Sequence, residues 1–252
     1  LDTSLDGSME ISSFGYNKLY NTNINEKILV NNLSYKSQDS IKNSGLINNY
    51  EFLFKNFNAD SKHSSNFKNR SENNIRGIFQ FNSKFPLQKK GEKYLSTLTP
   101  IFVAKFNPQS NKNISNEERL IDYSNIYSID RLSSSTTLEG GESFTIGNEF
   151  KLFNNIDKSS EIFSLNLAGS FRANENFDLP KSSYISQKTS NLVGQSKIKL
   201  NKFLDLEYDF LSDNNLGQFH YHNINSKIKI NNFVSTFEFI EEGDQIGKTH
   251  FI

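Results

Sequence analysis

Three acidic side chains recur at every second position in one stretch of the chain, and they form its densest set of groups with possible chemistry. They are Asp205, Glu207 and Asp209. Successive side chains of a strand point to opposite faces, so the three would form one row. Such a row could transfer protons or bind calcium. Cross-strand charge pairing is the simpler interpretation, because neighbouring stretches carry lysines at their polar positions. These lysines are Lys197, Lys199, Lys227 and Lys229.

Two histidines and a run of serines are the other groups that could do chemistry. His220 and His222 would lie on the same face of a strand, but a metal site needs a third ligand of matching geometry, and none is evident. The serines at 133–135 lack the Gly-x-Ser-x-Gly pattern of a nucleophile, and no glycine-rich phosphate loop occurs. The sequence therefore predicts no catalytic residue, no metal site and no cofactor.

The acidic row belongs to a stretch in which apolar residues occupy every other position. The apolar partners of the carboxylates are Leu204, Leu206, Tyr208 and Phe210. The same alternation recurs along the chain and predicts strands with one apolar and one polar face. We expect about eleven antiparallel strands. They cover residues 8–20, 27–37, 45–56, 76–85, 94–107, 142–154, 160–173, 191–201, 203–212, 217–230 and 233–241.

The strand lengths and connections indicate an up-and-down transmembrane β-barrel. Many of the strands reach the roughly 9–11 residues that a tilted membrane-spanning strand requires. Short polar turns are expected at 21–26, 155–159 and 213–217, and long connections at 57–75, 109–138 and 174–190. Tight turns combined with long loops are typical of outer-membrane barrels. Pro100 is the one proline predicted inside a strand, where it requires an edge or a bulge.

Composition limits the other classes. The chain has 252 residues, zero formal net charge, no cysteine, 35% hydrophobic and 13% aromatic residues. Without a basic stripe, nucleic-acid binding has little support. Low bulk hydrophobicity with many aromatic residues fits strands that have one apolar face and aromatic girdles, although an AT-rich genome would also enrich Phe and Tyr. A porin-like or nutrient-receptor channel and a soluble, carbohydrate-binding β-sandwich are the alternatives.

The connection predicted at residues 109–138 and the start of the next strand carry short motifs in a particular order. An Asp-Tyr-Ser-Asn-Ile-Tyr stretch at 122–127 precedes Asp-Arg-Leu at 130–132 and Leu-Glu-Gly-Gly at 138–141. This order resembles the long mid-barrel loop of the LptD family of outer-membrane lipopolysaccharide-assembly proteins. Residues 100–108 and 190–213 on either side are also similar to that family. The residues that carry the resemblance are Asp122, Asn125, Tyr127, Arg131, Glu139, Gly140 and Gly141.

The resemblance implies that residues 1–252 are part of a larger barrel in the outer membrane of a Gram-negative bacterium, without its periplasmic domain and terminal strands. It implies export of lipopolysaccharide (LPS), with an LptE-like plug lipoprotein and the periplasmic LPS-transport bridge as partners. In such a barrel Asp205, Glu207, Asp209, Lys227 and Lys229 would face the lumen. The lipid would then contact Leu204, Leu206, Tyr208 and Phe210.

Overall fold

The protein folds as one large antiparallel sheet. The computed structural model describes residues 6–20, 23–155, 160–200, 203–243 and 249–251. Its fourteen strands follow one another in space largely as in the sequence, in the order β1-β2-β4-β5-β7-β8-β9-β10-β11-β12-β13-β14, with β3 paired to β4 and β6 to β7. The strands are β1 (Gly7–Leu19), β2 (Asn25–Ser37), β3 (Ser40–Ile41), β4 (Ile47–Lys62), β5 (Ser71–Lys84), β6 (Leu87–Lys90), β7 (Tyr94–Asn107), β8 (Gly141–Asn154), β9 (Glu161–Arg172), β10 (Leu192–Lys199), β11 (Leu204–Ser212), β12 (Phe219–Ile230), β13 (Phe233–Glu242) and β14 (Thr249–Phe251).

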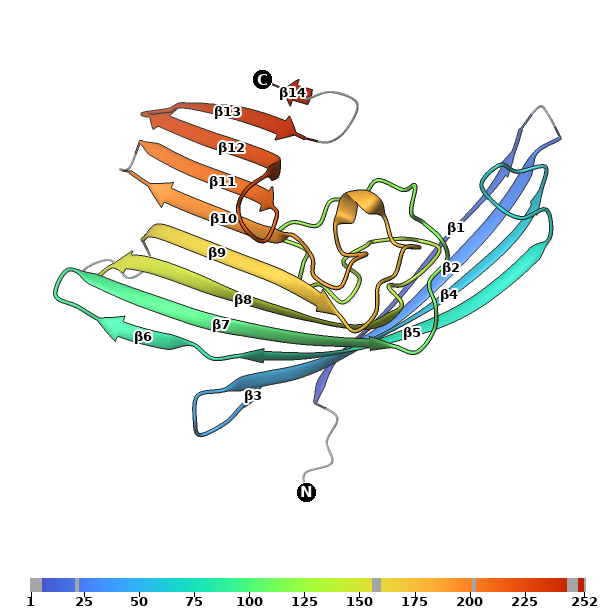
Figure 1. The fold of residues 1–252 in the computed structure, drawn as a ribbon, viewed down its shortest axis with the longest axis horizontal. Coiled ribbons are helices and arrows are strands. Elements are labelled where there is room, and N and C mark those ends of the chain that lie inside the picture. The colour runs from blue at the N-terminus through green and yellow to red at the C-terminus, as the bar shows by residue number, and fades with distance from the viewer. Residues whose placement is uncertain (1–5, 21–22, 156–159, 201–202, 244–248, 252) are drawn as a thin grey trace.

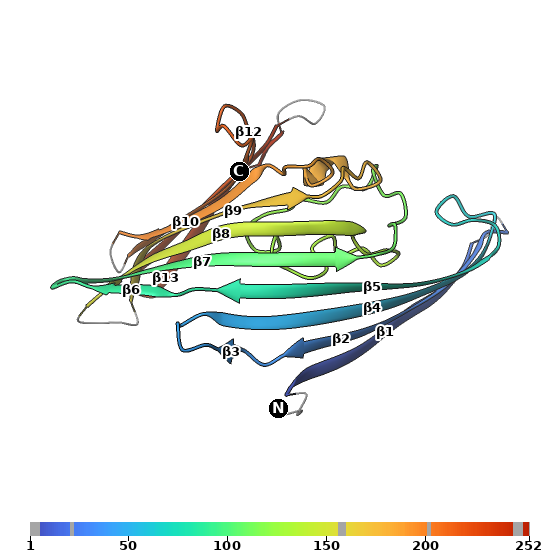
Figure 2. The same ribbon diagram turned by 60° about the horizontal axis from the view of Figure 1, so that its bottom comes forward.

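The sheet curves strongly, and its concave side holds two long connections (Figures 1 and 2). These run from 108 to 140 between β7 and β8, and from 173 to 191 between β9 and β10. The second includes a single turn of 3-10 helix, η1 (Lys181–Ser183). Within the described residues the sheet is not closed on itself, because β1 and β14 end the pairing order without pairing with each other. The concave side is called the inner face below.

The eleven predicted strands are confirmed, with two corrections. The prediction of a long connection at 57–75 is wrong, because β4 continues to Lys62 and β5 begins at Ser71. The count of about eleven omitted the short strands β3, β6 and β14. Most of the turn predicted at 155–159 lies outside the described residues.

Pro100 sits where the sheet can accommodate it. The pairing of β5 with β7 ends at Lys84, and β6 resumes it at Leu87. Pro100 lies opposite this interruption, where its carbonyl accepts a hydrogen bond from the Phe85 amide at 3.1 Å. An amide and a carbonyl of one strand residue point to the same neighbour, so the donor that proline lacks faces the break rather than a continuous ladder.

The convex face of the sheet remains uncovered along its apolar rows. Phe102, Phe106, Phe144 and Ile146 retain exposed fractions of 40%, 46%, 40% and 49%. A β-sandwich would bury this face against a second sheet. Within the part of the chain that the structure describes, all strands belong to a single sheet, so the sandwich alternative does not fit.

Candidate functional site

The two long connections together form a compact body on the inner face, here called the plug (residues 108–140 and 173–191). Its own core contains Ile121, Ile126, Leu132 and Leu179, each at most 1% exposed. This core packs against inner-face residues of the wall strands. The wall residues are Ala168, Val193 and Leu211. The plug is therefore a folded element with apolar contacts to β9, β10 and β11.

Hydrogen bonds join the two halves of the plug. The amide of Ile114 donates to the carbonyl of Asp178 at 2.8 Å, and the amide of Lys181 donates to Ser115 at 3.3 Å. The amide of Arg119 donates to Ser182 Oγ at 2.9 Å. These bonds satisfy backbone groups that regular secondary structure would otherwise pair, so the two connections hold each other in place.

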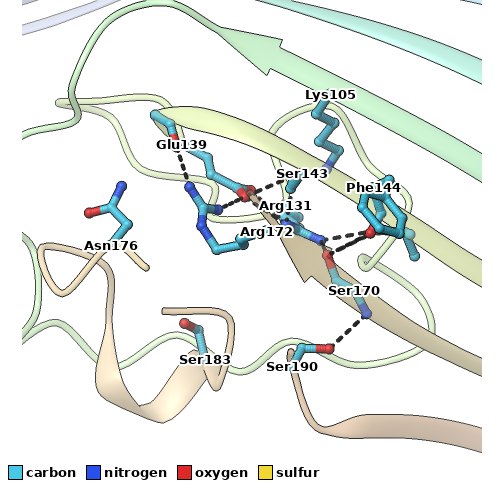
Figure 3. Close-up of polar contacts among 12 residues, drawn as sticks. Lys105, Arg131, Glu139, Ser143, Phe144, Ser170, Arg172, Asn176, Ser183 and Ser190 are labelled. Carbon is cyan, nitrogen blue, oxygen red and sulfur yellow. Dashed lines mark hydrogen bonds and ion pairs between the residues drawn. The ribbon is translucent and has the colours of Figure 1, made fainter. Parts of the chain in front are cut away.

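A buried ion pair inside the plug lies against the wall and is hydrogen-bonded to it (Figure 3). Arg131 Nε donates to Glu139 Oε2 at 2.7 Å and Arg131 Nη2 donates to Glu139 Oε1 at 2.6 Å, a bidentate pairing. The Arg131 side chain is 0% exposed and that of Glu139 is 4% exposed. Arg131 also reaches the wall hydroxyls of Ser170, at 2.9 Å, and Thr145, at 3.3 Å.

Glu139 is shared between two arginines. Arg172, at the end of β9, donates to the Glu139 carboxylate and to the carbonyl of Gly140. Asn107 Nδ2 donates to the Glu139 carbonyl at 2.9 Å. Burial alone would raise the pKa of the Glu139 carboxyl, but Arg131, together with Lys105 and Arg172, holds that pKa well below its usual range. Glu139 is therefore ionised, and it compensates cations from both the plug and the wall.

Two buried lysines and a glutamine of the wall bind the underside of the plug. Lys55 of β4 lies 2.8 Å from Asp130 and also donates to the Ser134 carbonyl. Lys105 of β7 donates to the Ser128 carbonyl. Gln80 of β5 donates to the Tyr127 carbonyl at 2.9 Å. Polar side chains of β4, β5 and β7 thus hold the plug backbone directly.

The residues of the 122–127 motif shape one turn of the plug. Asp122 Oδ1 accepts hydrogen bonds from the Ser124 amide at 2.8 Å and the Asn125 amide at 3.1 Å. Asn125 returns a bond to the Leu120 carbonyl at 3.0 Å. Tyr123 donates to Glu149 of β8 at 3.1 Å, and burial raises the pKa of both Tyr123 and Tyr127. These residues position the plug rather than offer groups for a reaction.

Glycines provide the space at the plug–wall contact. A β-carbon on Gly147 would lie 2.5 Å from the Leu167 carbonyl and would collide with the Tyr127 hydroxyl. A β-carbon on Gly140 would lie 2.6 Å from the Gln109 carbonyl. Gly141 has a φ of +86°, a backbone conformation that a side chain disfavours. The Glu-Gly-Gly motif therefore supplies both the carboxylate and the tight turn that brings it to the arginines.

The predicted charged row lies on the same inner face as the plug. Asp205, Glu207 and Asp209 occupy alternate positions of β11 that continue to Leu211, which packs on the plug core. Cross-strand pairs neutralise most of these groups: Lys229 lies 2.6 Å from Asp205 and Lys197 lies 2.9 Å from Glu207. Lys227 is opposite Asp205 in the register of β11 and β12. The structure thus brings the five predicted charged residues together on one face, in pairs that suit charge neutralisation.

The predicted apolar row lies on the opposite, convex face. Tyr208 and Phe210 stack there with a ring separation of 5.6 Å, and Tyr208 shares a hydrogen bond of 2.6 Å with His222. Leu204 and Leu206 continue the row. Aromatic pairs also occur toward both ends of β8 and β9 on this face. They are Phe144 with Phe171, and Phe150 with Phe163.

A comparison with protein families found one family model that covers the plug, both rows of β11 and most of the wall. The family model described as "LptD: LPS transport system D" matches residues 31–241. This chain belongs to the LptD family. A comparison with curated proteins found no match.

Membership of the LptD family explains the architecture. LptD proteins act in LPS transport at the outer membrane of Gram-negative bacteria, and this chain shares that location and general role. The open antiparallel sheet is a segment of the larger LptD barrel. None of the described residues forms a helix long and apolar enough to cross a membrane. Across the same residues, no group of three or more His, Cys, Asp or Glu is arranged to hold a metal ion.

The resemblance identified two charged residues of the anchoring network and missed three others on the wall. Arg131 and Glu139 stood in the recognised loop. Arg172, Lys55 and Lys105 come from strands, and their partners lie 33, 75 and 23 residues away in the sequence. An arginine at the end of a strand carries no local signal for such a partner. The sequence signal for these contacts was limited to the positive charges of Lys55 and Lys105 at inner positions of β4 and β7.

Proposed function

We propose that the inner face of this sheet lines a hydrated passage for the saccharide and phosphate part of LPS, and that the plug closes this passage. The observation that supports the proposal best is the anchoring of the plug by buried charges. Arg131 and Glu139 are 0% and 4% exposed, and five wall strands contribute polar contacts to the plug. Keeping ionised groups buried is costly unless they are paired, so the network maintains a defined closed position.

The charged row fits the wall of such a passage. Asp205, Glu207 and Asp209, with Lys227 and Lys229, would face water and offer both signs of charge, so a sugar-phosphate chain would meet donors and acceptors without one strong trap. The opposite row, Leu204, Leu206, Tyr208 and Phe210, would meet lipid. Lipid contact is stable there because the backbone groups of a closed barrel are paired within the sheet.

LPS would then enter the outer leaflet through a lateral exit of the complete barrel. An LptE-like lipoprotein would occupy the lumen, and the periplasmic LPS-transport bridge would deliver the substrate. Membership of the LptD family supports these partners, and the same membership favours LPS assembly over a porin-like or nutrient-receptor channel. No step of this process requires a catalytic residue of the chain.

Shortening the plug tests the proposal. Residues 113–136 would be replaced by a short Gly-Ser linker in the parent protein, which leaves Glu139 and its turn in place. We expect the outer membrane to become permeable to large antibiotics such as vancomycin, and surface LPS to decrease. The heat-modifiable band of the folded barrel serves as the control for assembly. Unchanged permeability and surface LPS, with normal barrel assembly, would refute closure by the plug.

A further inference from the structure

A polar patch lies on the convex face of the wall, near one end of β2, β4 and β5. The long connections of the plug leave the sheet at this same end, and long loops mark the outer side of an outer-membrane barrel. The ends of these strands therefore point toward the cell exterior, and they extend beyond the plug (Figure 1). Their convex face belongs to the outside of the barrel, away from the passage.

Polar side chains replace the apolar row as β4 approaches its outer end. Phe54, at a convex position, is 49% exposed. The next convex positions along the strand are all polar. They are Asn56, Asn58, Asp60 and Lys62. A strand rises about 3.3 Å per residue and tilts by about 40° in such a barrel, so this polar stretch extends roughly 15 Å above the apolar band. At this height the wall would meet the sugars of the surrounding leaflet rather than its acyl chains.

The polar patch contains an open pocket that crosses three strands. Its volume is about 430 Å³, within the roughly 300–1000 Å³ that ligand pockets span. In the register of the sheet, Asn58 lies between Leu29 and Asn73. Backbone pairing therefore builds the pocket, and its shape does not depend on a loop. The convex residues of its lining are Lys27, Leu29, Asn58, Asp60, Ser71 and Asn73.

Hydrogen bonds fix three side-chain amides in a line at this pocket. Asn73 Nδ2 donates to Asn58 Oδ1, and Asn58 Nδ2 donates in turn to Asn56 Oδ1. Asn58 Nδ2 also donates to the Leu29 carbonyl at 3.4 Å. Among the described residues, Asn73 Oδ1 at one end of the line and Asn56 Nδ2 at the other take part in no hydrogen bond. The line thus offers a ligand one oriented acceptor and one oriented donor.

The convex side of the pocket has no net charge. Its two charged side chains, Lys27 and Asp60, lie opposite each other in the register of β2 and β4. Asp60 also accepts a hydrogen bond from Ser71 Oγ at 3.1 Å. Glu72 belongs to the inner face by alternation, and it accepts a hydrogen bond from Asn74 at 3.0 Å. A phosphate would meet a cation and an anion together, whereas sugar hydroxyls can donate to Asp60 and accept from Lys27.

We propose that this convex pocket binds neutral sugars of the LPS molecules that surround the barrel in the outer leaflet. The ligand is a resident molecule of the membrane and not the molecule in transit. Leu29, which is 46% exposed, offers an apolar surface to the C–H groups of a sugar ring beside the amides. Such a contact would fix the height of this part of the wall in the leaflet. The inference depends on which face of the sheet meets the membrane, and not on the passage or its closure by the plug.

Site-specific photo-cross-linking in the parent protein, in its own outer membrane, tests the pocket. A photoreactive residue would replace Leu29 in the pocket. In a matched control it would replace Asn17, which lies opposite Lys27 on the convex side of β1 and outside the pocket lining. Cross-linked LPS is detected with an antibody to its lipid A part, in cells with complete LPS and in cells whose LPS lacks the core sugars.

We expect cross-links at position 29 several-fold above those at position 17, and their loss in cells with truncated LPS. Asn73→Ala removes one end of the amide line and should lower the cross-link at position 29 several-fold. Asn74→Ala removes the same group from the inner face of the adjacent position and should leave that cross-link unchanged. The heat-modifiable band of the folded barrel shows that each variant assembles.

Equal cross-linking at positions 29 and 17 would overturn a specific site. Cross-links at position 29 that persist without the core sugars would indicate contact with the lipid end and overturn the saccharide assignment. A cross-linked protein in place of LPS would make the patch a protein-docking surface and overturn the proposal, as would the absence of any cross-link at position 29. None of these results bears on the passage, which shortening the plug tests separately.

Discussion

Removing the negative charge of Glu139 should release the plug without unfolding the wall. Glu139→Gln replaces a carboxylate with a neutral amide. In the native protein this carboxylate accepts hydrogen bonds from Arg131 at 2.6 and 2.7 Å and also pairs with Arg172. Both guanidinium groups would stay buried, since their side chains are 0% and 2% exposed. Breaking a buried ion pair in this way costs about 3–5 kcal/mol. The strand ladders do not involve this side chain, so the cost falls on the closed plug.

A loss of that size has a measurable consequence. Each 1.4 kcal/mol changes an equilibrium constant tenfold, so the open plug should become about 10²- to 10⁴-fold more populated. External trypsin on intact cells reports this population when reclosing is faster than cleavage, because residues 108–140 contain Lys112, Arg119 and Arg131. We expect rapid cleavage within the plug of Glu139→Gln and an intact heat-modifiable barrel.

A matched variant separates burial from charge. Glu117 pairs with Arg119 at 3.0 Å, but their side chains are 40% and 36% exposed. Glu117→Gln should therefore cost no more than about 1 kcal/mol, because exposed ion pairs contribute little. If trypsin cleaves Glu139→Gln and Glu117→Gln at the same slow rate, the buried network does not hold the plug, and our reasoning is refuted.

Three further outcomes are expected. Because the pKa of Glu139 is lowered in the folded protein, its stabilisation of the closed plug is complete above the ordinary carboxyl pKa of about 4. This stabilisation is lost only as the pH falls through the lower, folded pKa. Proteolysis with pepsin should therefore show a closed plug at pH 5 and opening only in stronger acid. Gly147→Ala should loosen the plug, because a β-carbon there would lie 2.5 Å from a backbone oxygen of β9 and against a plug tyrosine. A β-carbon on Gly169 would meet nothing within 4 Å, so Gly169→Ala should leave the rate of trypsin cleavage unchanged. Equal cleavage rates of the two variants would contradict the packing at Gly147. Leu206→Arg on the convex face should cost about 2–4 kcal/mol near the middle of the bilayer and reduce the amount of folded barrel. Asn225→Arg, opposite Glu207 on the inner face, should assemble normally. If Asn225→Arg reduced the folded barrel and Leu206→Arg did not, the assignment of the lipid-facing and water-facing sides would be wrong.

The strands could be predicted because the two faces of the wall differ so clearly. In β11, apolar and charged residues alternate, and the observed register places each set on one face. The pattern failed at residues 57–62, where Phe57, Ala59 and Ser61 also alternate but lie among Asn and Asp. Phe57 is 2% exposed because Phe67 of the following hairpin stacks on it at 5.9 Å. A contact with a residue in the connection between β4 and β5 leaves no local signal, so polar composition suggested a loop.

The plug could be located from the sequence but not assembled. The order of Asp122, Asn125, Arg131 and Glu139 indicated a specific connection. Its partner, residues 173–191, has no comparable motif, and its place beside the first connection depends on the sheet that brings β7, β8, β9 and β10 together. The lysines that hold the plug could not be distinguished from lysines that face water, because burial is a property of the assembled inner face.

The central claim is that the sheet is a membrane wall with water on its plug side and lipid on the other. Single cysteines at positions 204–210 of the parent protein, in its own membrane, test it most directly, and the 252 residues contain no native cysteine. Each cysteine would be probed with a water-soluble thiol reagent and a lipid-borne quencher. We expect lipid contact at 204, 206, 208 and 210, and water access at 205, 207 and 209. Burial of the even positions from both probes would contradict the membrane wall.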